Sequence, residues 1–154
     1  MKAFLITLLV IGSCGLMRPE ASNIKGVLLQ SGYNHNGGKG EYHTISVAPD
    51  GSASKEDETF ESNFPKTGVV KHRYEAHIAP TDFESLAKKI ADLGFYSKAV
   101  SDEPDVFEDL VVIDGTKGQK AISVVGSQDR DVIEMANAVR DLTKDLQWKE
   151  VPAN

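Results

Sequence analysis

The chain of 154 residues contains a single cysteine, so it cannot form a disulfide framework within one molecule. It has no apolar run of the roughly 20 residues that a membrane-spanning helix requires. Basic residues are in the minority, with 17 Lys and Arg against 23 Asp and Glu. Because an acidic surface is repelled by phosphate backbones, we expect no nucleic acid partner.

Familiar catalytic and metal-binding motifs are missing as well. The sequence has no HExxH pair, no paired cysteines and no GxSxG elbow. Residues 37–40, Gly-Gly-Lys-Gly, lack the GxxxxGK[ST] pattern of a phosphate-binding loop and lead into an expected strand instead of a helix. His72 and His77 are five positions apart and would point to opposite faces of a strand. We therefore expect no metal site, no cofactor and no enzymatic activity.

The N-terminus carries the clearest signal that is present. Lys2 precedes an apolar run over residues 3–11, which is typical of a cleavable export signal. The sequence Ile11-Gly12-Ser13-Cys14 then resembles the bacterial lipobox, in which the cysteine thiol is alkylated with diacylglycerol. This resemblance implies a signal peptide over residues 1–13 and a lipid-modified Cys14, with acyl chains such as palmitate, as the mature N-terminus.

Acyl chains on Cys14 would hold the protein stably on a membrane surface. We therefore expect a membrane-anchored lipoprotein of the bacterial cell envelope that faces the periplasm or the exterior. The alternative is ordinary secretion, with cleavage near Ala21-Ser22.

Residues 14–22 are predicted to be a polar tether, and residues 23–150 a single α+β domain. Alternating apolar residues between turn signals predict strands, and two later segments have helical periodicity. The expected order is β-β-β-α-β-β-α, an antiparallel sheet of about five strands with two amphipathic helices on one face. The strands are expected at residues 24–29, 42–48, 69–78, 109–113 and 119–125. A weak strand is expected to continue from the second of these over residues 52–66. The helices are expected at residues 80–94 and from 127 or 129 to 146.

Several side chains in these elements have predicted roles. Thr81 and Glu84 have the spacing of a capping box at the start of the first helix. Gly94 is expected to end that helix in the left-handed conformation, with Phe95 folding back against it. His72 is placed on the inward face of its strand, as a hydrogen-bonded core or sheet-edge residue.

Residues 31–40 are rich in glycine and asparagine and are predicted to form a long loop. Aromatic anchors in an adaptable loop suit protein recognition, so Tyr33, His35, Asn36 and Tyr42 are the candidate binding residues. The competing interpretation is a disordered connection without function. Two further alternatives stay open: a metal-dependent hydrolase that uses His35 and His43, and a purely structural envelope lipoprotein.

Residues 82–90, the pair Gly94-Phe95 and the turn at 114–118 resemble motifs of small exported bacterial domains of uncharacterised function. The order of elements, together with Ser31-Gly32 after the first strand, is similar to that of the emfourin-type inhibitors of thermolysin-like metallopeptidases. The resemblance implies a protein-binding module without enzymatic activity that inhibits a peptidase.

Overall fold

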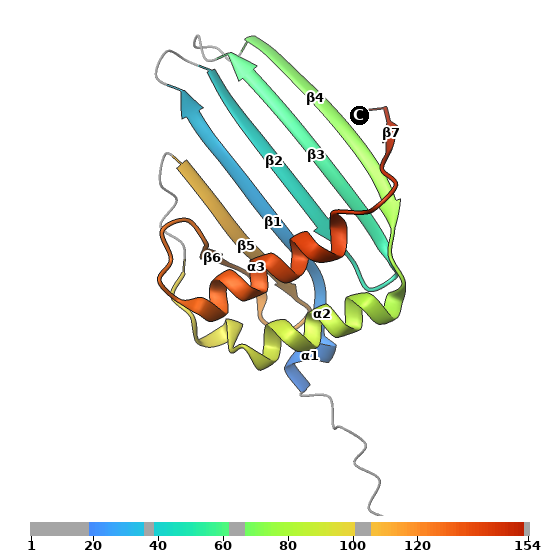
Figure 1. Ribbon diagram of the computed structural model, residues 1–154, viewed down its shortest axis with the longest axis vertical. Coiled ribbons are helices and arrows are strands. Elements are labelled where there is room, and N and C mark those ends of the chain that lie inside the picture. The colour runs from blue at the N-terminus through green and yellow to red at the C-terminus, as the bar shows by residue number, and fades with distance from the viewer. Residues whose placement is uncertain (1–18, 36–38, 62–66, 101–105, 153–154) are drawn as a thin grey trace, which may run out of the picture.

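The computed structural model describes residues 19–35, 39–61, 67–100 and 106–152 of the chain. Seven strands form one antiparallel sheet in the order β6-β5-β1-β2-β3-β4-β7, and the two longer helices lie on one face of it (Figure 1). The elements are α1 Pro19–Asn23, β1 Ile24–His35, β2 Lys39–Val47, β3 Ser52–Glu61, β4 Thr67–His77, α2 Pro80–Asp92, a 3₁₀ turn Phe95–Ser97, β5 Val106–Asp114, β6 Gly118–Ser123, α3 Arg130–Thr143 and β7 Lys149–Val151.

The α+β class and the antiparallel sheet are confirmed, but the number of elements is larger than expected. Within the described residues, the sheet has seven strands where about five were predicted, and there are three α-helices where two were predicted. The additional α1 and β7 have five and three residues, too few for a periodic pattern. Residues 19–22 of the predicted tether belong to α1, where Ala21 is buried.

The core lies between α2, α3 and the facing side of the sheet. The predicted helical stripes are buried there, and Phe95 behind α2 is completely inaccessible to solvent. Gly94 has a φ of 76°, as the predicted left-handed cap requires. The helix starts at Pro80 as predicted, but the capping box is wrong: the N-cap is Ala79, two residues before Thr81, and its side chain makes no capping bond.

The predicted loop over residues 31–40 is wrong for its larger part. β1 and β2 stay paired from Val27↔Val47 out to His35↔Lys39, and β1 also pairs with β5 as far as Tyr33. Only residues 36–38 of the segment lie outside the described residues. β1 has a hydrogen-bonded neighbour on each side, so ladder formation overrides the turn preference of its Ser, Gly and Asn residues.

The inward face predicted for β4 is correct at one end only. Ala76 and Ile78 are buried in the core, whereas Val70 is 52% exposed. The His72 side chain is 51% exposed and not part of the core. The reason is that α2 and α3 cross one end of the sheet, while β1 to β4 extend well beyond them (Figure 1).

Candidate functional site

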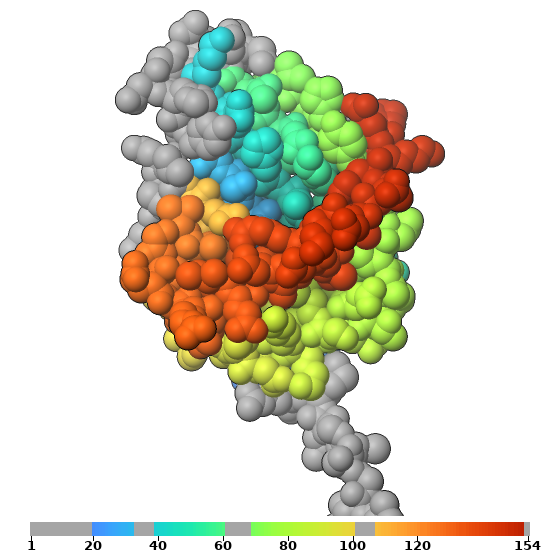
Figure 2. All heavy atoms as spheres, viewed as in Figure 1, coloured from blue at the N-terminus to red at the C-terminus, as the bar shows by residue number. Residues whose placement is uncertain are grey.

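The candidate site is the part of the helix-side sheet face that α3 leaves uncovered, which we call the open face. Figure 2 shows side chains of β1 to β4 exposed next to α3 in this region. Its described members are partly or largely exposed: Ser31, Glu41, His43, Ile45, Lys55, Asp57, Thr59, Val70, His72, Tyr74 and Glu150.

Strand register builds the open face in cross-strand rows, because directly paired residues of an antiparallel sheet point to the same side. The row nearest the core starts from buried Leu29 and continues through Ile45, Lys55 and Tyr74. The next row contains Ser31, His43, Asp57 and His72. The outermost row places Glu41, Thr59 and Val70 side by side.

Asp57 is the centre of the polar network on this face. Its Oδ1 accepts a hydrogen bond from His43 Nδ1 at 2.8 Å, and its Oδ2 lies 3.0 Å from Lys55 Nζ. Partial burial raises the pKa of the Asp57 carboxyl, but these two donors outweigh it and hold the pKa below its usual value. Lys55 Nζ also lies 5.4 Å from the centre of the Tyr74 ring, within range of a cation–π interaction.

Ion pairs also define the two borders of the open face. On the β7 side, His72 Nδ1 lies 2.9 Å from Glu150 Oε1. On the α3 side, Arg140 contacts Glu108, the β5 residue opposite Ser31, at 2.5 Å. The open face is therefore a strand-borne surface of mixed charge with one aromatic ring, bordered by α3 and β7.

Of the four candidate binding residues, the structure describes the side chain of Tyr42. Tyr33 and His35 take part in the β1–β2 ladder, but their side chains, like Asn36, are outside what the structure describes. Tyr42 lies on the opposite face of the sheet. There its ring stacks on Phe60 at a centroid distance of 5.1 Å and tilts against Phe107 at 5.7 Å. Tyr42 is thus a packing residue of the helix-free face.

Sequence reasoning missed most of the open face. Lys55, Asp57 and Thr59 lie in the segment predicted as a weak strand, where charged residues also fill the positions between them, so the sequence has no polar–apolar alternation that would reveal this face. His43 was considered only as a metal ligand paired with His35. His35 stands opposite Lys39, four residues from His43 along β2, so their backbones are about 13 Å apart.

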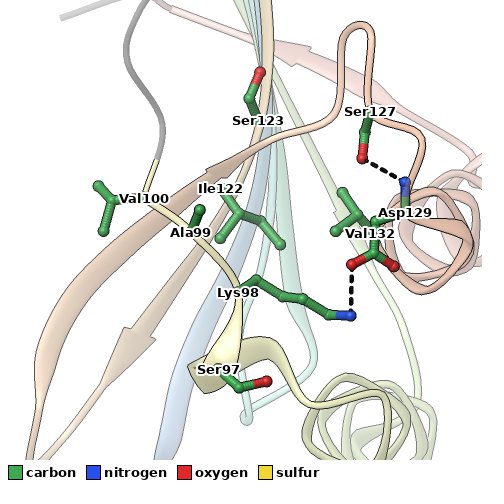
Figure 3. Close-up of a pocket in the computed structure, with 9 residues that line it drawn as sticks. All are labelled: Ser97, Lys98, Ala99, Val100, Ile122, Ser123, Ser127, Asp129 and Val132. Atoms are coloured by element: carbon green, nitrogen blue, oxygen red, sulfur yellow. Dashed lines mark hydrogen bonds and ion pairs between the residues drawn. The ribbon is translucent and has the colours of Figure 1, made fainter.

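A cavity of about 440 Å³ lies elsewhere, between residues 97–100, β6 and the start of α3 (Figure 3). Lys98 reaches across it and binds Asp129 at 2.7 Å and Asp131 at 3.0 Å, which raises the pKa of Lys98 and lowers that of Asp129. Behind it, Lys120 Nζ donates to the carbonyl oxygens of Tyr96 and Lys98 and fixes this turn. Because Lys98 and its two ion pairs span this cavity, we take the open face, whose side chains are exposed on the surface, as the candidate site.

No family model, curated protein or solved structure matches the chain. Within the described ranges, His, Cys, Asp and Glu side chains form no group of three that could hold a metal ion. In the same part of the chain, no helix is both long and apolar enough to cross a bilayer.

Proposed function

We propose that the protein is a lipid-anchored, non-enzymatic protein-binding module of the bacterial cell envelope, and that it contacts its partner through the open face. The observation that carries the proposal is the uncovered half of the sheet, where charged side chains and Tyr74 stand on strands instead of on mobile loops. Preorganised side chains lose little conformational entropy on binding, which favours recognition. The lipobox-like sequence before Cys14 supports the membrane anchor.

The size of the open face limits what it can bind alone. Four strands and three rows span about 20 Å by 20 Å, on the order of 400 Å². A standard protein–protein interface buries about 800 Å² on each partner. A stable complex therefore needs a second contact region next to the open face, or else the interaction is transient.

The anchor is tested by replacing Cys14 with serine, which removes the thiol that would carry the lipid. We expect Cys14→Ser to move the protein from the membrane pellet to the soluble fraction, because no acyl chain would then hold it in the bilayer. Ser13→Ala is the matched control, since it keeps a small residue before the cysteine and should leave the protein in the pellet. A Cys14→Ser protein that still sediments with membranes would remove the lipid anchor from the proposal.

Partner contact is tested with a photo-crosslinking amino acid in place of Thr59, which is exposed on the open face. The control position is Ile113, which is 39% exposed and lies on the opposite face of the sheet. We expect a discrete protein adduct in intact cells from position 59 and a much weaker one from position 113. Equal labelling from both positions, or none from 59, would count against a specific partner on the open face.

The adduct also decides the class of partner. The resemblance to emfourin-type inhibitors implies a thermolysin-like metallopeptidase, and mass spectrometry of the adduct identifies the protein that is bound. A peptidase supports the inhibitor form of the proposal. Another envelope protein supports the binding function and removes peptidase inhibition from it.

A further inference from the structure

The helix-free face of the sheet has one part that is almost without charge. Directly paired residues of an antiparallel sheet point to the same side, so the register places alternate residues of four neighbouring strands on this face. They run from Gly26 to Gly32 in β1, from Tyr42 to Ser46 in β2, from Phe107 to Ile113 in β5 and from Gln119 to Ser123 in β6. We call these positions the neutral face. They include no Lys, Arg, His or Glu, and their one charged residue, Asp109, is only 4% exposed.

The charged residues of the helix-free face lie on β3 and β4 instead. The same cross-strand rows carry Glu56 and Glu58 when they reach β3, and Lys71 and Arg73 when they reach β4. Charged residues make up 26% of the chain, so a fully solvated surface would be expected to carry several on the neutral face as well. Depletion of charge in the centre, with a polar rim beside it, distinguishes a protein interface from the rest of a protein surface.

Two glycines keep the neutral face flat. A Cβ on Gly32 would overlap the Tyr42 ring, whose centroid lies 5.7 Å from that of the Phe107 ring. A Cβ on Gly26 would lie 3.3 Å from Ile113 Cδ1. These larger side chains therefore lie over the glycines, along the sheet instead of away from it. Two flat sheets pack well face to face, about 10 Å apart, so a second sheet has the complementary shape.

A second copy of this chain supplies such a sheet. In a twofold-symmetric dimer the same patch faces itself, so a charged patch meets like charge, whereas a neutral patch does not. A twofold axis along the strands places both α1 helices at the same end of the dimer, because α1 lies at the end of the sheet where β1 begins (Figure 1). Five residues, 14–18, separate Cys14 from α1 and span at most about 17 Å. Both proposed lipid anchors can then enter one bilayer.

The size of the neutral face indicates a weak dimer that depends on the membrane. Four strands span about 19 Å, and the six steps from Gly26 to Gly32 span about 20 Å, which gives on the order of 400 Å². A standard interface buries about 800 Å² on each partner. Anchoring to one bilayer raises the effective concentration of the two copies, which compensates for a small contact area.

We infer that the neutral face is the interface of a homodimer, in which two anchored copies pack their sheets face to face. This inference uses the proposed lipid anchor and does not depend on the proposed partner. The open faces lie on the other side of each sheet, so they point outwards from the dimer. One dimer then presents two partner sites.

The test places a photo-crosslinking amino acid at Thr44, on the neutral face, in the full chain in intact cells. We expect an adduct with twice the mass of one chain, in which mass spectrometry finds this protein alone. Thr81 is the control position, since it is exposed on α2 and lies away from the neutral face. It should give at least tenfold less of the dimer adduct.

A second set of variants introduces charge into the proposed interface of the chain with the probe at position 44. Leu28→Lys should reduce the dimer adduct at least tenfold, because it would bury two ammonium groups between the sheets. Ala121→Lys should also reduce it at least tenfold, and it removes no large side chain, so it serves if Leu28→Lys does not fold. Thr81→Lys should change the dimer adduct less than twofold. Thermal unfolding of each variant shows whether the fold is retained.

Three outcomes overturn the inference. One is a dimer adduct from position 44 no stronger than that from position 81, and another is an adduct with a different protein or with lipid, which would make that the occupant. The third is a dimer adduct that a folded Leu28→Lys or Ala121→Lys chain keeps in full.

The identity of each adduct keeps this test separate from that of the proposed function. Position 59 reports on a partner at the open face, whereas position 44 reports on a second copy. Ile113 lies at the border of the neutral face, so an adduct from position 113 that contains two copies of this chain is not a partner adduct. A partner adduct from position 59 without a dimer leaves the binding function in place, and a dimer without a partner adduct removes it.

Discussion

Replacing Asp114 by asparagine is expected to lower the free energy of unfolding by about 3 kcal/mol at neutral pH, because the amide nitrogen in place of Oδ2 cannot accept the Tyr96 hydrogen bond and the remaining hydrogen bonds are no longer to a charged acceptor. Asp114 is only 4% exposed. Its Oδ2 accepts a hydrogen bond from the Tyr96 hydroxyl at 2.5 Å, and its Oδ1 accepts from the amides of Thr116 and Lys117 at 2.7 and 2.8 Å. The β5–β6 turn and the segment after α2 are joined through this one side chain.

The same substitution should also change the acid sensitivity of the protein. Burial raises the pKa of Asp114, but the hydrogen bonds from Thr116, Tyr96 and Lys117 outweigh it and hold the pKa far below the ordinary 3.8. A carboxyl whose pKa is depressed on folding contributes stability above pH 3.8, and this contribution is lost as the pH falls below that value. Urea unfolding at pH 7 and pH 3 measures the difference, which should be clearly smaller for Asp114→Asn.

Asp50 provides the control for Asp114. It accepts hydrogen bonds from the amide and hydroxyl of Ser52 in a similar turn, but it is exposed. Asp50→Asn should therefore cost much less stability. Equal effects of the two substitutions would mean that the turn geometry, and not the buried carboxylate, is what matters.

Introducing a methyl group at Gly32 is expected to destabilise the protein by about 2 kcal/mol through overpacking. A Cβ at this position would overlap the Tyr42 ring and lie 2.9 Å from Phe107 Cε1. Tyr42 cannot easily move away, since its other side stacks on Phe60. Thermal and urea unfolding of Gly32→Ala measure the loss.

Two further variants show whether contact with the Tyr42 ring causes the destabilisation of Gly32→Ala. In Gly26→Ala, at another helix-free-face position of β1, the new Cβ would lie 3.3 Å from the end of the flexible Ile113 side chain, so a smaller loss is expected. In a double-mutant cycle, Tyr42→Ala should recover part of the cost of Gly32→Ala. Strictly additive losses would refute this packing role for Tyr42.

The sequence predicted those parts of the fold that depend on local periodicity. The stripes of α2 and α3 and the Gly94 cap follow from spacing within a few turns of chain, and the start of α3 at Asp129 is one of the two predicted starts. The full length of the β1–β2 hairpin could not be predicted from local spacing, because Ser31-Gly32 is locally typical of a turn. Only the neighbouring strands β2 and β5 make it a central ladder.

The open face was beyond sequence reasoning for a different reason. Alternation placed His72 on the correct side of β4 but could not say how far the helices would cover that side. α3 has 14 residues, about 21 Å, and crosses the sheet, whereas the 12 residues of β1 extend about 40 Å (Figure 1). Exposure of His43, Asp57 and His72 follows from this mismatch in length, which only the tertiary arrangement reveals.

The three-residue length of β7 has a consequence for solubility. Without β7, residues 73–75 would also lack a strand on the outer edge of β4. A longer unpaired edge promotes aggregation between copies. A much longer β7 would pair with β4 along its whole outer edge. Lys71 lies on the part of β4 that β7 does not cover, and a charged residue on an edge strand discourages such aggregation.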